Sequence, residues 1–155
     1  MRSKIFLKNV RILIFLILLS GGCSNEDDMQ TVIYPSIIGK GDLNGSGKEG
    51  IQQQNIVISD TAAWNDLKIK MDSYNNTTGS FTETEINFSE YIILAAFSEL
   101  RPLGGCSIEI KNVLEYSGGI NVTIENFVPN AGVAEETQPY HIVKIPKTNK
   151  QIFFE

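Results

Sequence analysis

The chain has 155 residues, of which 42% are apolar and 20% are charged, and its formal net charge is −5. This length and composition are typical of one globular domain. The acidic balance argues against nucleic acid as a partner and against an anionic membrane surface. One histidine and two cysteines are too few for a zinc site of the usual kind, and we expect neither a metal nor a cofactor.

The N-terminus has the pattern of a secretory signal. Basic side chains lie within residues 1–11, an unbroken apolar run covers residues 12–19, and three small residues at 20–22 precede Cys23. Eight apolar residues are too few for a membrane-spanning helix, which needs about 20. The sequence therefore predicts a signal peptide over residues 1–22.

Cys23 resembles the lipobox cysteine of bacterial lipoproteins, although Ser20 stands where lipoboxes usually have leucine. The resemblance implies that Cys23 becomes the new N-terminus and carries acyl chains, palmitate among them, which anchor the protein stably in a membrane. A plain signal peptide followed by a chance cysteine is the alternative. Loss of the four basic residues of the signal leaves nine basic against 18 acidic residues, a formal charge of −9.

Residues 23–36 are predicted to form an acidic, flexible tether. Three adjacent acidic side chains end the run 24–28, and such runs are usually solvated. In some Gram-negative lineages an acidic stretch at these positions is a surface-export signal, which this run resembles. We therefore expect a lipid anchor in the outer membrane with display at the cell surface; the inner face of that membrane is the alternative. A lipidated Cys23 leaves Cys106 without a disulfide partner.

A single β-rich domain is predicted for residues 37–155. A first strand begins at Ile37-Ile38, and the segment 39–50, with five glycines, is predicted to be a mobile turn. The β-type run Asn55-Ile56-Val57-Ile58 indicates a second, short strand.

One helix of about three turns is predicted for residues 61–73. Side-chain oxygens of the segment 59–61 can accept amide protons from its first turn, as N-cap residues do. Its apolar stripe, at helical spacing, consists of Trp64, Leu67 and Met71. The sequence Asp60-Thr61-Ala62 also resembles an O-glycosylation signal of some bacteria, with a plain helix cap as the alternative.

Strands dominate the rest of the chain. The continuous apolar run 91–97 predicts a central strand that is covered on both faces, and Ser117-Gly118-Gly119 has the composition of a hairpin turn. Further strands are predicted at 107–113, 120–127 and 140–145, with a short last one at 151–154. The fold class is therefore α+β: a mainly antiparallel β-sheet with one early amphipathic helix.

Two segments in the glycine-rich region resemble ligand-binding loops but lack required residues. Asp42–Gly47 resembles the start of a calcium loop, yet the twelfth position is Gln53 instead of glutamate and no helices flank it. Gly45–Lys48 fails as a phosphate loop because Glu49 follows the lysine where a hydroxyl is needed. We expect a simple glycine-rich turn.

Cys106 and His141 are the only pair that could supply a thiol nucleophile and its base. Both positions are typical of strands, where a free cysteine is most often a small apolar residue and a histidine satisfies a structural hydrogen bond. We therefore expect that the protein is not an enzyme.

The most specific pattern is carried by two segments. Residues 101–110 run from a Pro-Leu-Gly-Gly turn into an alternating strand, and residues 138–146 read Gln-Pro-Tyr-His-Ile-Val-Lys-Ile-Pro. Together they resemble the C-terminal domain family of PrcB, a lipid-anchored subunit of a protease complex, over roughly residues 50–147. Leu103 and Cys106 depart from the threonine and tyrosine usual in that family. The resemblance implies a non-catalytic envelope lipoprotein that binds or stabilises a partner, such as a secreted protease or another envelope protein.

The turn at Pro102, Leu103, Gly104, Gly105 and Cys106 is the predicted partner-binding surface. Its two glycines permit backbone torsions that other residues resist, so the turn can be tight or closely approached. A purely structural turn is the alternative. A second functional hypothesis is a small β-rich protease inhibitor that presents the same loop to an active-site cleft, although the chain lacks a companion loop bearing a tryptophan.

Overall fold

The computed structural model describes residues 29–155, so the predicted signal peptide, Cys23 and the acidic run at 24–28 lie outside the described residues. The described chain is α+β, with eight strands and one α-helix, which confirms the predicted fold class. The elements are β1 Thr31–Val32, β2 Ser36–Leu43, β3 Gln54–Ile58, α1 Thr61–Met71, the 3-10 helix η1 Thr78–Ser80, β4 Tyr91–Phe97, β5 Ser107–Tyr116, β6 Gly119–Phe127, β7 Gln138–Pro146 and β8 Ile152–Phe154.

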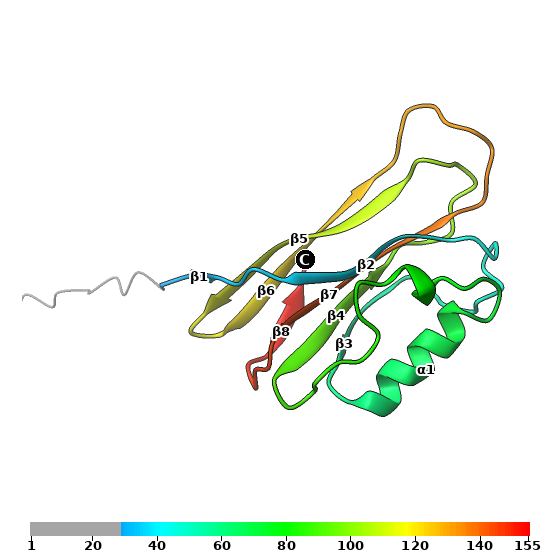
Figure 1. Cartoon of the computed structure of the whole chain (residues 1–155). Helices are drawn as coiled ribbons and strands as arrows, with labels where there is room; N and C mark the ends of the chain where they lie inside the picture. The colour runs from blue at the N-terminus through cyan, green and yellow to red at the C-terminus, as the bar shows by residue number, and fades with distance from the viewer. Residues whose placement is uncertain (1–28) are drawn as a thin grey trace, which may run out of the picture.

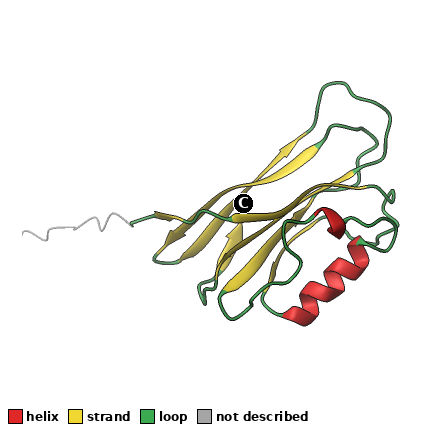
Figure 2. Ribbon diagram, in the orientation of Figure 1, coloured by secondary structure: helices red, strands yellow, loops and turns green. Residues whose placement is uncertain are grey.

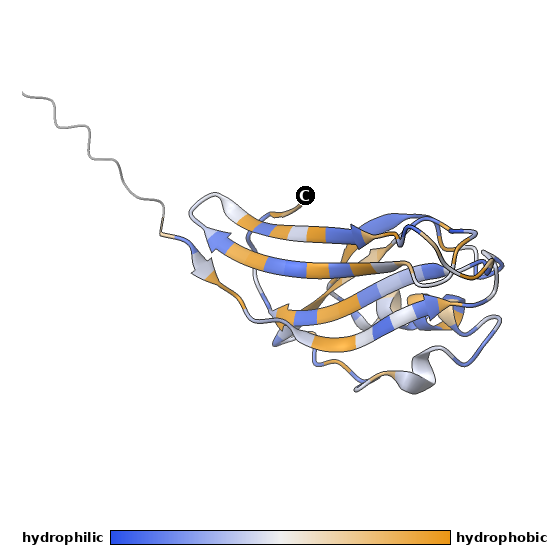
Figure 3. Cartoon of the chain, turned by 90° about the horizontal axis from the view of Figure 1, so that it is seen from above, coloured by the Kyte–Doolittle hydropathy of each residue, from blue (hydrophilic) through white to orange (hydrophobic). Residues whose placement is uncertain are grey.

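The strands form two four-stranded sheets instead of one, and α1 adds a third layer (Figures 1 and 2). The outer sheet has the order β1-β5-β6-β8, and the central sheet has the order β2-β7-β4-β3. All pairings are antiparallel except that of β6 with β8, which is parallel. Polar and apolar residues alternate along β5 and β6 of the outer sheet, as expected where a strand presents one face to a core (Figure 3).

The central sheet is buried on both faces, as β4 shows. Its alternate residues Ile92, Leu94 and Ala96 belong to the core between the two sheets. The intervening residues belong to a second core beneath α1. This arrangement confirms the predicted central strand, because a run of seven apolar residues without polar alternation is stable only where both faces are covered.

The N-terminal strands pass from one sheet to the other. β1 pairs with β5 in the outer sheet, whereas β2 pairs with β7 in the central sheet. Between them, the Ile33 amide donates to the Val113 carbonyl at 2.9 Å, which extends the pairing with β5 beyond β1. Thr31 and Val32, which lie in the segment expected to be a tether, are thus part of the folded sandwich.

Residues 39–43 were expected in a mobile turn but belong to β2, so this prediction was wrong. Glycines weaken a strand pattern in sequence, yet here Gly39 serves close packing. A Cβ on Gly39 would lie 2.5 Å from the ring of Phe81, so only glycine lets this ring reach the strand. The turn itself is confined to residues 44–50.

The helix α1 has the cap and buried stripe that its sequence predicts. The Asp60 carboxylate accepts a hydrogen bond from the Ala63 amide at 2.9 Å, and Trp64, Leu67 and Met71 are buried. The Trp64 indole donates to the Thr84 carbonyl at 2.8 Å, which satisfies its one polar atom. The helix ends at Met71 instead of Ser73.

We expect the substitution Asp60→Ala to lower the free energy of unfolding by about 1 kcal/mol, because it removes an N-cap hydrogen bond. Urea unfolding followed by circular dichroism measures this change. Asp66→Ala, at an exposed carboxylate of the same helix, is the control and should change stability by less than about 0.5 kcal/mol. Equal effects of the two substitutions would contradict the capping role.

Candidate functional site

The turn Pro102–Cys106 packs against the loop 128–137 and does not stand free. The Gly104 amide donates to the Val133 carbonyl at 2.9 Å, and a Cβ on Gly104 would lie 2.9 Å from Val133 Cγ2. Gly105 has a φ of +85°, a conformation that favours glycine. Both glycines are therefore required by contacts and torsions within this chain.

Only part of the predicted contact surface is accessible. Pro102 and Gly105 are exposed and Leu103 is half-buried, whereas Gly104 and Cys106 are buried. The Cys106 thiol donates to the Leu103 carbonyl at 3.2 Å, as expected of a small buried residue with a weak donor. A partner at this turn would meet Pro102, Leu103 and the backbone of Gly105.

The structure adds apolar residues that sequence reasoning missed. Phe127, Val128 and Val133 are 60%, 44% and 66% exposed, and they lie where β6 leaves the outer sheet and in the loop that follows. In the sequence, the adjacent apolar residues Phe127 and Val128 break the polar–apolar alternation of β6, and this break was the available signal. Side chains this apolar usually avoid water, so several of them around one loop indicate an interaction surface.

We expect Gly104→Ala to destabilise the fold by about 1–3 kcal/mol, because the added methyl group overlaps the Val133 side chain. In the double variant Gly104→Ala, Val133→Ala the overlap is removed, so the loss should be smaller than for Gly104→Ala alone. The measurement is a double-mutant cycle: the free energy of unfolding of both single variants and of the double variant, from thermal or urea unfolding. Additive losses would show that the two loops do not constrain each other.

His141 joins the two sheets through a buried hydrogen bond. It lies in β7, is 2% exposed, and its Nδ1 accepts a hydrogen bond from the Ile110 amide of β5 at 2.8 Å. The register of β5 shifts directly after Ile110, so this amide lies at a bulge in the strand. An accepting Nδ1 requires the neutral ring with its proton on Nε2.

The surroundings of His141 favour that neutral form. Burial first, and then the positive charge of Lys40, lower the pKa of His141 to about 4, against the opposing effect of Glu109. Lys40 itself pairs with Glu109 at 3.3 Å and lowers the pKa of this carboxyl. The hydrogen bonds of Cys106 and His141 go to different backbone groups, which fits the structural interpretation of both residues.

We expect acid to destabilise the fold through His141. Its pKa is about 6.5 when unfolded and about 4 when folded, so the unfolded chain binds more protons between these values and stability falls as the pH falls. From pH 7 to pH 4 this amounts to about 3 kcal/mol.

The measurement is urea unfolding at both pH values for the unaltered chain and for His141→Gln, which cannot be protonated in this range. The unaltered chain should lose about 3 kcal/mol more than the variant over this interval. Parallel losses in the two proteins would contradict the buried neutral histidine.

A buried carboxylate closes the glycine-rich turn. Glu49 is 4% exposed, and its Oε1 accepts a hydrogen bond from the Gly45 amide at 2.7 Å. Asp42 lies in β2, where burial and then the charge of Glu135 raise its pKa. Within residues 29–155 no group of three or more histidine, cysteine or acidic side chains is placed to hold a metal.

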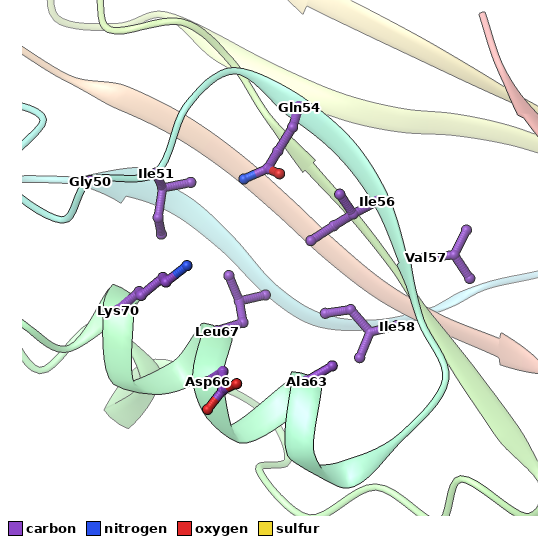
Figure 4. Close-up of a pocket in the computed structure, with 10 residues that line it drawn as sticks. All are labelled: Gly50, Ile51, Gln54, Ile56, Val57, Ile58, Ala63, Asp66, Leu67 and Lys70. Atoms are coloured by element: carbon purple, nitrogen blue, oxygen red, sulfur yellow. The ribbon is translucent and has the colours of Figure 1, made fainter.

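A groove lies between β3 and α1, with a volume of about 350 Å³ (Figure 4). Most of the labelled side chains of the strand and of the helix point into it from opposite sides, whereas Val57 points away (Figure 4). Its lining consists of Gly50, Ile51, Gln54, Ile56, Val57, Ile58, Ala63, Asp66, Leu67 and Lys70. Sequence reasoning missed this groove because it forms only when the helix packs across the sheet.

Thr61, the hydroxyl of the predicted glycosylation signal, is the first residue of α1 and is exposed. The preceding Asp60 is engaged as the helix cap. Glycosylation at Thr61 stays a prediction.

Comparison with known proteins gave no match to a family model, to a curated protein or to a solved structure. The resemblance to the PrcB C-terminal domain family therefore stays a prediction. Among the described helices, none has the length and apolar character needed to cross a membrane.

Proposed function

We propose that the protein is a non-catalytic envelope lipoprotein that binds a partner protein through the end of the sandwich. The contact surface, here named the loop end, consists of Pro102, Leu103, Val128, Pro129 and Val133. The observation that carries the proposal is the exposure of apolar side chains on two loops that are fixed against each other. Loops held in this way lose little conformational freedom on binding, which favours affinity.

The two loops adjoin closely enough to act as one surface. A Cβ on Gly105 would lie 3.6 Å from the ring of Pro129, and one on Gly132 would lie 3.1 Å from Leu103 Cδ1. Apolar atoms of the turn and of the loop 128–137 therefore meet directly. A surface of this kind, apolar and rimmed by polar residues, is typical of a protein interaction site.

The rim of the loop end is acidic. Glu135 and Glu136 are exposed in the loop 128–137, which has no basic residue. The nearby Arg101 is paired with Glu99 at 2.6 Å, which leaves less of its positive charge for a partner. An apolar partner surface with basic residues around it is the best complement, because opposite charge at the rim speeds association and excludes wrong partners.

In this proposal Cys23 carries the lipid anchor and the folded domain begins at Thr31. Eight residues span at most about 28 Å when fully extended, so the domain stays close to the membrane. A secreted protease is the partner class that the PrcB resemblance implies. Inhibition of a protease by the Pro102–Cys106 loop has less support, because Gly104 and Cys106 are buried and cannot enter a cleft.

We expect Val133→Lys to abolish recovery of the partner from detergent-solubilised native membranes, because it removes an apolar contact and adds a charge of the wrong sign. The measurement is quantitative mass spectrometry of proteins that co-purify with the tagged full chain. A loss of at least about tenfold corresponds to a central contact.

The matched control is Ile69→Lys on α1, since Ile69 is 68% exposed and Val133 is 66% exposed. The control should recover the partner as the unaltered chain does. A companion that survives Val133→Lys would place the contact elsewhere, and the absence of any stable companion would overturn the proposal. An activity assay of a recovered protease then separates support from inhibition.

A further inference from the structure

The strand β3 is an edge strand that lacks the usual protection against pairing with another chain. It pairs with β4 on one side only, in continuous register and without a bulge. Its sequence, Gln-Asn-Ile-Val-Ile, has no charged residue and no proline. Native sheets normally blunt such an edge with charges, proline, bulges or very short strands, because its free backbone groups are a template for another strand.

The other three edges of this molecule carry those features. β1 has two residues and β8 has three, so neither offers a long template. β2 has a register shift between Ile37 and Gly39 and bears Lys40 and Asp42. Among the sheet edges of residues 29–155, β3 therefore offers the one edge that combines five residues, a continuous register and no charge.

The groove beside this edge can accept the side chains of an added strand. On β3, Gln54, Ile56 and Ile58 point toward α1, whereas Val57 points away (Figure 4). The opposite wall is formed by Ala63 and other residues of the helix. Alternate residues of a strand that pairs with β3 would enter the groove, since side chains alternate between faces along a strand.

Two charges on the helix side of the groove are available to a ligand. Asp66 and Lys70 lie one helical turn apart on α1 and both line the groove. Neither side chain has an ion-pair partner among residues 29–155. An added strand would therefore gain from a basic residue near Asp66 and an acidic residue near Lys70.

We propose that the edge of β3 binds an extended segment of a net-basic partner protein, whose alternate apolar side chains fill the groove between β3 and α1. The charge of the chain favours such a partner over a second copy, because two copies that each carry a formal net charge of −5 repel one another. This surface is separate from the loop end, so the inference does not depend on the proposed function.

The test uses a phage-displayed library of random 12-residue peptides, selected on the full chain in mild detergent. Enriched peptides should show apolar residues at alternate positions together with one basic and one acidic residue. Synthetic copies of them should slow hydrogen exchange of the β3 amides. Peptides without this alternation, peptides that protect another element, or no enrichment at all would overturn the proposal.

Ala63→Arg is the blocking variant, because Ala63 is exposed, lines the groove and contributes only its backbone to the helix cap. It should weaken binding of the enriched peptide at least about tenfold in fluorescence anisotropy. Ala62→Arg, at the exposed neighbouring residue that does not line the groove, should leave the affinity unchanged. Equal affinities for the two variants would overturn the proposal.

A charge exchange gives a second readout. The double variant Asp66→Lys, Lys70→Asp should prefer a peptide in which the basic and acidic residues have exchanged places. Light scattering of the full chain tests whether a second copy occupies the groove. A dimer that dissociates on Ala63→Arg would assign the groove to a second copy and overturn the proposal. Val133→Lys should leave peptide binding unchanged, so failure here and failure of the loop end are distinguishable.

Discussion

Burial of the central sheet on both faces is the constraint on which the rest of this structure depends. Strands β4 and β7 lie inside that sheet, and Ile93 and Leu94, adjacent in sequence, are fully buried in the two separate cores. Each such side chain contributes about 1.5–3 kcal/mol through its removal from water. The cysteine of the described residues, Cys106, is free, so packing has to hold the layers together without a covalent link there.

Polar links then fix how the two sheets meet at one edge. The chain passes from β1 to β2 at this edge. In the core beneath it, the His141 ring accepts a hydrogen bond from the Ile110 amide. At the surface, the Lys40–Glu109 ion pair joins the two sheets. A buried polar group without a partner costs free energy, so the bulged amide of β5 needs the acceptor that His141 supplies. This requirement explains why a histidine in the core can be structural and why it must stay neutral.

The layered fold presents two different surfaces. The loop end exposes apolar side chains on the turn Pro102–Cys106 and the loop 128–137. These two loops pack against each other at their glycines, and acidic residues lie around them. The groove is apolar, lies beside the free backbone groups of β3, and has one charge of each sign on the helix, at Asp66 and Lys70. Under the two proposals, the loop end binds a folded partner with a basic rim, and the groove binds an extended segment.

Local features were predictable from the sequence because they depend on neighbouring residues. A helix cap within residues 59–61, the stripe on α1 and the buried run of β4 follow from hydrogen-bonding capacity and periodicity alone. Only the tertiary structure decided that Gly39 lies in a strand under Phe81, that Gly104 is covered by Val133, and that the strands divide into two sheets. These outcomes depend on contacts between residues far apart in the chain. The same sequence pattern is compatible with a glycine in a flexible turn and with a glycine at a site of close packing. Only the neighbour that fills the space next to the glycine decides between them.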